Sequence, residues 1–197
     1  MAPAEGKKKL VKKACKMKNP IVDLNCVPIE QTLDGEALSY LFLWGTHLNN
    51  EQFTWVFDLF NKNMRSYYEK SQWGYDAENK KQELQATTSR YVLVRNSVGR
   101  YVAFCHYRFC MDHASAVVYC YEIQVEPDYQ SKGVGTLLIS MLITVCERTG
   151  MDKVMATVFA FNEKSLGFFH KLGFAADITC PDAEQGLDYL ILSHAIS

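Results

Sequence analysis

The clearest pattern in the chain is a run of apolar residues spaced three and four apart between positions 53 and 68. This spacing places them on one face of an α-helix, and the side chains of Asn49 and Asn50 just before the run are suited to cap its N-terminus. Residues 38–44 form a short apolar run that indicates a strand. We therefore predict a strand and then an amphipathic helix whose apolar face carries Phe53, Val56, Phe57, Phe60, Met64, Tyr67 and Tyr68.

The rest of the chain alternates between strand and helix patterns. The polar residues 76–89 predict a second short helix, and the runs 90–95, 101–111 and 116–126, rich in Val, Tyr and Phe, predict strands joined as antiparallel hairpins by short links. Helical spacing returns from residue 137 until Gly150, and 162–171 predicts a further helix. Strands are expected at 153–160, 174–178 and 187–195. A helix between two strands allows these to be parallel neighbours, so we predict an α/β fold with a mixed sheet and helices on both faces.

Length and charge indicate one domain behind a basic segment. The 197 residues, 48% of them hydrophobic, suffice for one sizeable core. We predict an arm over residues 1–34, partly helical at most, and a single domain over residues 35–197. The net charge is −1, yet seven lysines lie in the first twenty residues. We interpret them as a nuclear import signal or a solvated tail, and the alternative is phosphate contact with nucleic acid or the ribosome.

The sequence shows no run of eighteen apolar residues, and its first residues lack the apolar stretch of a secretion signal. We therefore expect an intracellular protein without membrane contact. Its expected location is the nucleus and cytoplasm. Seven scattered cysteines include no C-x-x-C pair, which predicts reduced thiols and no metal site.

A glycine-containing loop stands where a predicted strand ends and a helix begins. Free amides and the helix dipole favour phosphate at such a place, and glycines permit close approach to the backbone. A dinucleotide fingerprint would need a third glycine at Leu138, and a Walker loop would need Gly-Lys-Ser/Thr, so the spacing excludes both. The remaining interpretations are an ordinary turn or another phosphate loop, formed by Gln130, Ser131, Lys132, Gly133, Val134, Gly135 and Thr136.

The Q-x-x-G-x-G pattern of this loop resembles the pyrophosphate loop of the GNAT superfamily of N-acetyltransferases. Residues 162–174, with an asparagine, a small residue three positions on, an aromatic pair and Gly-Phe, resemble the second signature of that superfamily. The resemblance implies the GNAT fold and acetyl-coenzyme A as cosubstrate, without a metal. Phe169 departs from the tyrosine that many members use to protonate the thiolate. Besides the loop, the implied cofactor-binding residues are Gln124, Val125, Asn162, Ser165 and Phe169.

Acetyl transfer to an amine needs a neutral amine and a proton for the sulfur. Glu122 is the best candidate for the base, directly or through a water, although a salt-bridged strand glutamate is an equal interpretation of its position. Tyr121 is a candidate proton donor, and Tyr119 a candidate substrate contact. In a regular strand these tyrosines face away from Glu122, so a shared pocket requires a bulge or a splayed strand.

From about residue 50 onwards the chain also resembles the NatD class of N-alpha-acetyltransferases, which modifies histone N-termini. The resemblance implies that Tyr68, Trp73, Tyr119, Tyr121 and Glu122 line the peptide and reaction site. It implies the Ser-Gly-Arg-Gly termini of histones four and two-A as substrates, with no obligatory auxiliary subunit. Cys110 stands where that class is expected to carry an acidic residue, so Asp112 is the nearest candidate for that contact.

Three other functions remain open: two other acetylation reactions and one binding role without catalysis. The enzyme could instead acetylate lysine side chains, or a small amine such as a polyamine. The chain could also be a module that binds coenzyme A or histone tails without turnover.

Overall fold

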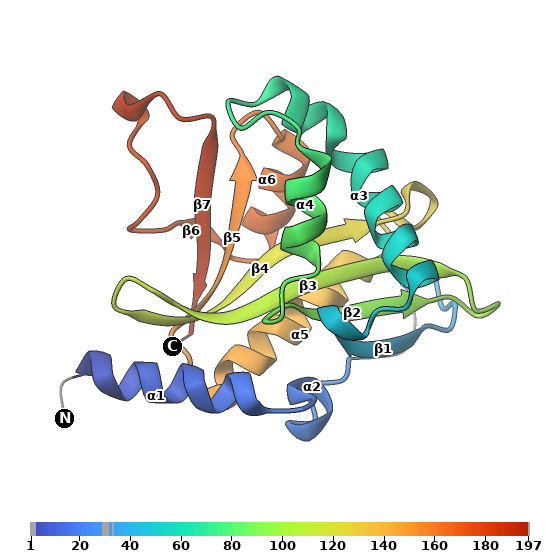
Figure 1. Cartoon of the computed structure of the whole chain (residues 1–197), viewed down its shortest axis with the longest axis horizontal. Helices are drawn as coiled ribbons and strands as arrows, with labels where there is room; N and C mark the ends of the chain where they lie inside the picture. The colour runs from blue at the N-terminus through green and yellow to red at the C-terminus, as the bar shows by residue number, and fades with distance from the viewer. Residues whose placement is uncertain (1–2, 29–31, 33, 197) are drawn as a thin grey trace.

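A computed structural model describes residues 3–28, 32 and 34–196. Residues 1–2, 29–31 and 33 of the predicted arm, and residue 197 of the predicted domain, lie outside the described residues. Figure 1 shows a central twisted sheet flanked by helices. The elements are α1 (Pro3–Lys16), α2 (Pro20–Asp23), β1 (Ser39–Trp44), α3 (Asn50–Lys70), α4 (Ala77–Leu84), β2 (Arg90–Arg95), β3 (Tyr101–Asp112), β4 (Ser115–Val125), α5 (Val134–Thr149), β5 (Lys153–Phe159), α6 (Glu163–Lys171), β6 (Ala175–Ala176) and β7 (Tyr189–Ala195).

The strands form one mixed sheet, seven-stranded within the described residues, in the order β1-β2-β3-β4-β5-β7-β6. β1 to β4 pair antiparallel through short connections, while β4 and β5 pair in parallel because α5 carries the chain back between them. The predicted hairpins, the parallel pair and the α/β class are confirmed.

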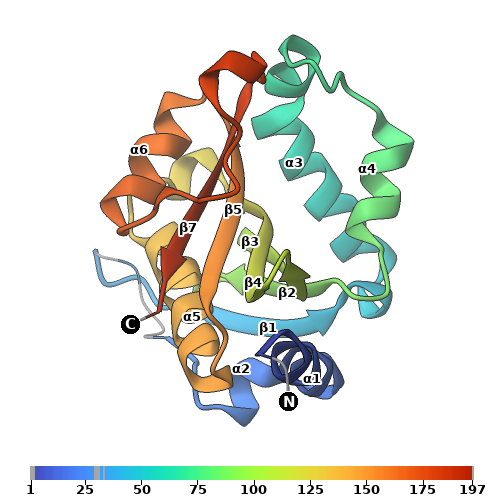
Figure 2. The same cartoon turned by 90° about the vertical axis from the view of Figure 1, so that its left-hand side faces the viewer.

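Helices cover both faces of the sheet, as predicted (Figure 2). On one face, α3 buries Val56, Leu59 and Phe60 against β2 and β3. Its N-terminus is fixed by a capping box between Asn49 and Gln52. On the other face, α1, α2, α5 and α6 pack into a larger apolar cluster. The sheet that carries the site is therefore packed against helices on both faces.

The basic segment is more helical than predicted, because α1 packs lengthwise on β3 and β4 (Figure 1). Ala14 is buried in this contact. The guanidinium of Arg90 donates hydrogen bonds to the carbonyls of Cys15 and Met17, where α1 ends. In the part of the chain that the structure describes, no helix is both long and apolar enough to cross a membrane.

One predicted strand is shorter than expected: residues 174–178 yield only the two-residue β6. Asp177 ends the pairing because its carboxylate accepts hydrogen bonds from the backbone and hydroxyl of Thr179 and from the ammonium of Lys153. This local turn competes with the sheet ladder. The chain then leaves the sheet until β7.

Candidate active site

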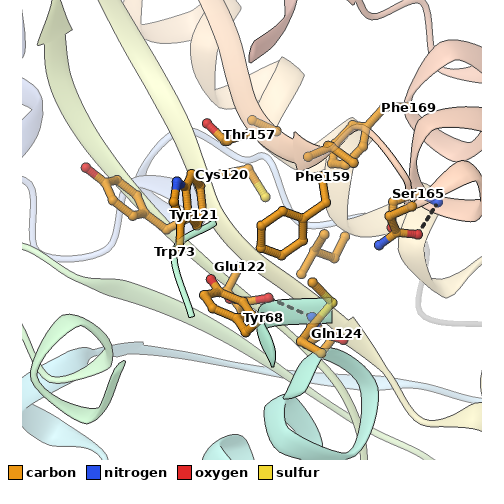
Figure 3. A pocket seen from close by; sticks show the side chains of 15 residues that line it. Tyr68, Trp73, Cys120, Tyr121, Glu122, Gln124, Thr157, Phe159, Ser165 and Phe169 are labelled. Atoms are coloured by element: carbon orange, nitrogen blue, oxygen red, sulfur yellow. Dashed lines mark hydrogen bonds between the residues drawn. The ribbon is translucent and has the colours of Figure 1, made fainter. Parts of the chain in front are cut away.

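The central feature of the site is a split in the sheet between β4 and β5. The two strands pair only from Val117 to Cys120 and from Lys153 to Ala156, and then separate. A pocket opens at the split (Figure 3). It is lined by Met64, Tyr68, Trp73, Cys120, Tyr121, Glu122, Ile123, Gln124, Ala156, Thr157, Val158, Phe159, Asn162, Ser165 and Phe169.

A β-bulge decides which side chains of β4 face this pocket. His106 of β3 is paired with Glu122, but the next residue, Tyr107, is paired with Cys120, so Tyr121 is the extra residue. Such an insertion shifts the alternation of side chains by one position. Tyr119, Tyr121 and Glu122 consequently share the α3 side of the sheet. The bulge that their shared position requires is present.

Glu122 is buried and held from two directions. Its Oε2 lies 2.8 Å from the Nζ of Lys80, and its Oε1 accepts a 2.6 Å hydrogen bond from the Nε2 of Gln124. The amide oxygen of Gln124 in turn accepts a hydrogen bond from Asn63 of α3. The salt bridge that the sequence left as an alternative therefore exists, but inside the pocket and not on the surface.

Aromatic rings form the α3 side of the pocket. The rings of Tyr68 and Trp73 each lie 5.1 Å from that of Phe159, centroid to centroid, and Trp73 packs equally closely on Tyr189. Burial, with a further contribution from the charge of Glu122, raises the pKa of Tyr68 to about 12. Trp73 is half exposed, so this wall is accessible at the pocket rim.

Tyr121 lines the pocket, and Tyr119, which does not, continues the row of aromatic rings along β4. The ring of Tyr121 lies between those of His106 and Tyr119 and beneath the guanidinium of Arg108. The hydroxyl of Tyr119 is hydrogen-bonded to that of Thr157, and burial raises its pKa to about 12. Burial also raises the pKa of Tyr121. Both phenols therefore keep their protons at neutral pH.

The predicted phosphate loop forms the N-terminus of α5. Gly133 caps this helix with φ +83°, and Ser131 has φ +63°, both in the left-handed region. Gly133 has no side chain to occupy the first amides of α5, which lack intrahelical acceptors. At Gly135 a Cβ would lie 3.2 Å from the ring of Phe168, so this glycine lets α6 approach closely. The loop presents an electropositive cradle of amides between the end of β4 and α6.

The other predicted cofactor residues connect this loop to the pocket. The Nε2 of Gln130 donates to the carbonyl of Val125, which also accepts from Asn63. Asn162 caps α6 by accepting a hydrogen bond from the amide of Ser165. Asn162, Ser165 and Phe169 line the pocket from the α6 side, opposite the aromatic wall. Neither Val125 nor any residue of the loop 130–136 lines the pocket, and Lys132 instead pairs with Asp34.

Asp112 lies near Tyr119, whose pKa is raised by burial and, to a lesser extent, by the negative charge of Asp112. It stands at the tip of the β3–β4 hairpin, and its carboxylate lies 3.6 Å from the ammonium of Lys153. Neither Asp112 nor Cys110 lines the pocket. A role for Asp112 in substrate contact stays a prediction.

Several residues of the site escaped sequence reasoning. Lys80 lay within a polar stretch interpreted as a connecting helix, and Asn63 on the polar side of α3. Thr157, Phe159 and Arg108 lie in segments whose pattern predicts strands but does not distinguish these residues from their neighbours. One signal could have pointed to Lys80: in α4 it precedes Leu84 by four positions, which puts it on the buried face of that helix.

Comparison with known proteins places this arrangement in a family. A model of the acetyltransferase (GNAT) family matches residues 39–174. The chain is 32% identical over 76 residues to the ribosomal protein bS18 alanine N-acetyltransferase of Escherichia coli (strain K12), covering 39% of this chain and 49% of that protein. It is 29% identical over 85 residues to an L-methionine sulfoximine/L-methionine sulfone acetyltransferase of Salmonella typhimurium, covering 43% and 45%. The chain thus spans about half the length of the curated relatives it matches.

Solved structures agree on the fold. The Escherichia coli ribosomal-protein-S18-alanine N-acetyltransferase superposes with a TM-score of 0.55 at 18% identity, covering 81% of this chain and 95% of that one. Arabidopsis thaliana Naa50 superposes with a TM-score of 0.55 at 16% identity, covering 80% and 99%. The split strands, the free amides of α5 and the open edge of β4 fit the extended thioester cosubstrate of such enzymes. The chain belongs to the acetyltransferase (GNAT) family, whose members use acetyl-coenzyme A.

Proposed function

We propose that this protein transfers an acetyl group from acetyl-coenzyme A to the N-terminal α-amine of proteins. The observation that carries the proposal is the position of Glu122 in the split between β4 and β5. The aromatic wall of α3 meets Glu122 from one face of the sheet, and the residues of α6 reach the same pocket from the other face. An amine and a thioester entering from opposite faces therefore meet beside one buried carboxylate.

Each proton of the reaction has a group in the pocket to handle it. Acetyl-coenzyme A supplies a thioester whose acetyl group passes to the amine nitrogen, while its sulfur gains a proton. Glu122 takes the proton that the amine loses, directly or through a water. Tyr121, with Tyr119 behind it, is the donor of the second proton, because Phe169 has no hydroxyl and both phenols remain protonated at neutral pH.

The pocket suits an α-amine better than a lysine side chain. The reference pKa of an N-terminal amine is about 7.7–8.0, against about 10.4 for lysine, so a carboxylate suffices as its base near neutral pH. The backbone amide of Gln72 donates a 2.6 Å hydrogen bond to Asp188, and its side chain donates to the carbonyl of Gly186. These bonds tie the loop after α3 to the loop before β7, and we propose that this link restricts entry in favour of a chain end.

We further propose that histone tails beginning Ser-Gly-Arg-Gly are the preferred substrates, recognised without an auxiliary subunit in the nucleus and cytoplasm. The resemblance of Tyr68, Trp73, Tyr119, Tyr121 and Glu122 to the histone-modifying class supports this. The absence of an acidic side chain at Cys110 argues for a different contact to the arginine. The Escherichia coli relative is named as an alanine N-acetyltransferase of ribosomal protein bS18, which supports a peptide beginning with alanine as the second candidate. The ratio of kcat/KM for the two peptides decides between them.

The Glu122→Gln variant tests the chemistry. Glutamine keeps the size and the contact to Gln124 but cannot take a proton, so we expect turnover to fall about 10²–10⁴-fold. Coenzyme A binding, measured by calorimetry, should stay unchanged. Glu147→Gln, on the exposed side of α5, is the matched control with full activity. Unchanged turnover in Glu122→Gln would remove Glu122 from the mechanism, and a wild-type protein that binds coenzyme A but transfers nothing would be a binding module.

A further inference from the structure

Lys80 is a buried lysine whose three ammonium donors are all satisfied inside the site. Its side chain is only 6% exposed. The Nζ lies 2.8 Å from Glu122, 2.8 Å from Glu83 and 3.1 Å from the hydroxyl of Tyr68. It also lies over the ring of Phe60, 4.6 Å from its centroid. Burying an ammonium is costly unless it is fully paired, so this geometry holds Lys80 in one place.

We propose that Lys80 is a positioning residue that acts through Glu122: by neutralising this carboxylate, it stops Glu122 from trapping the substrate amine as an ammonium ion. The inference rests on the proposed function, since it concerns an amine that attacks beside Glu122.

The physical reason lies in the charge that an incoming amine meets. An opposite charge within about 4–6 Å favours the charged form of a group by roughly 1–3 pKa units. A lone Glu122 carboxylate would therefore hold the α-amine protonated, and a protonated amine has no electron pair for attack. With Lys80 on Oε2, the amine meets an ion pair instead, whose field is much weaker. The free lone pairs of Glu122 can still accept a hydrogen bond from a neutral amine or a water.

The other groups around the ion pair do not compensate for a missing Lys80. Burial raises the pKa of Tyr68 to about 12 and that of Tyr91, on β2, well above its usual value, so both phenols are neutral. Burial, with the charges of Arg108 and Lys80, holds the pKa of His106 well below its usual range. The remaining charges are Glu83 on α4 and Arg108 on β3, whose guanidinium bonds a carbonyl of α4 and stacks on Tyr121. The cations Lys80 and Arg108 thus balance the anions Glu122 and Glu83. Removal of Lys80 leaves a net charge of one negative unit beside the amine.

The pH dependence of kcat and KM tests the proposal, with a free-amine peptide as substrate. Lys80→Gln keeps a hydrogen-bond donor near Glu122 but loses the charge, and Lys80→Met loses both. In each variant we expect the acid limb of the kcat profile to move up by about one pH unit or more. At pH 7 the kcat should therefore fall about tenfold or more, and near pH 9–10 it should return to the wild-type value. The KM for the peptide should be unchanged or lower. Lys80→Arg should keep the limb in place. Lys81→Met, next to Lys80 but partly exposed and paired with Glu78, should match the wild type.

The outcomes separate this proposal from the proposed function. A loss of the same factor at every pH in Lys80→Gln and Lys80→Met, with no movement of the acid limb, would show a purely structural role and overturn the proposal. Circular dichroism identifies a variant that fails to fold, in which case the remaining two substitutions at this position decide. A wild-type protein without turnover on any free-amine peptide would overturn the proposed function and the role of Lys80 together.

Discussion

Replacing Arg90 by methionine should detach the end of α1 from the sheet. The guanidinium of Arg90 donates to the carbonyls of Met17 at 2.6 Å and Cys15 at 3.0 Å, with longer contacts to Ala14 and Lys18 at 3.4 Å. It also stacks on Trp44, 3.8 Å from the ring centroid. A cation at this position complements the dipole at the C-terminus of α1. Methionine retains the apolar stem of the side chain but makes none of these polar contacts.

The expected cost follows from the two short bonds. A hydrogen bond to a charged donor contributes about 1.5–3 kcal/mol net, and the carbonyls left behind are partly buried. Removing the buried guanidinium also removes its desolvation cost, which offsets part of the loss. We therefore expect Arg90→Met to lower the free energy of unfolding by about 3 kcal/mol. For a chain of this size that corresponds to a fall of about 6–12 °C in Tm.

Urea unfolding followed by far-ultraviolet circular dichroism measures this cost, and hydrogen exchange should show lost protection in α1. The matched control is Arg100→Met, because Arg100 makes an exposed ion pair with Asp128 that should contribute less than about 1 kcal/mol. If Arg90→Met costs no more than Arg100→Met, the guanidinium does not anchor α1 and the reasoning is refuted.

Three further substitutions probe other parts of the account. Gly133→Ala places a side chain at φ +83°, so we expect about 1–2 kcal/mol of destabilisation together with a raised KM for acetyl-coenzyme A. The control Gly150→Ala, at φ +70° at the opposite end of α5, should cost similar stability without a change in this KM. An unchanged KM in Gly133→Ala would remove the loop from cosubstrate binding. Tyr121→Phe should lower kcat about 10²-fold while coenzyme A binding stays constant, and an unchanged kcat would assign the proton to Tyr119 or water. Burial opposes ionisation of Asp177, but hydrogen bonds from Lys153, Ser193 and Thr179 hold its pKa below the usual value. The stability that these bonds contribute is present above about pH 4 and is lost as the pH falls further. The difference in unfolding free energy between wild type and Asp177→Asn should therefore shrink below pH 4, and a difference that is constant from pH 3 to 7 would contradict this.

The order and type of the elements could be predicted because each is encoded locally. Local sequence decides the spacing of apolar residues in α3 and its asparagine cap. It also decides where α5 ends, because a glycine follows that helix. The shortness of β6 was not predicted: the turn between Asp177 and Thr179 is local, but the hydrogen bond that holds the Asp177 carboxylate comes from Lys153, 24 positions away in sequence. The helical extent of α1 was underestimated for the same reason, since its anchor Arg90 belongs to β2.

The site was predicted in part. Sequence motifs predicted the loop at Gly133 and the residues of α6. Each of these two groups belongs to a single helix, so its spacing is visible in the sequence. The bulge at Tyr121 was stated only as a requirement, since it depends on the register between β3 and β4. The burial of Lys80 against Glu122 joins two elements forty-two positions apart in sequence. Contacts of this kind arise from the packing of α4 on the sheet, to which a single sequence gives no access.

The most direct test of the central claim is acetyl transfer from acetyl-coenzyme A to two peptides, with mass spectrometry to locate the acetyl group. One peptide begins Ser-Gly-Arg-Gly with a free amine, and the other has the same sequence with a blocked N-terminus and an internal lysine. We expect acetylation of the free α-amine alone. Acetylation of the lysine in the blocked peptide, or transfer to neither peptide, would contradict it.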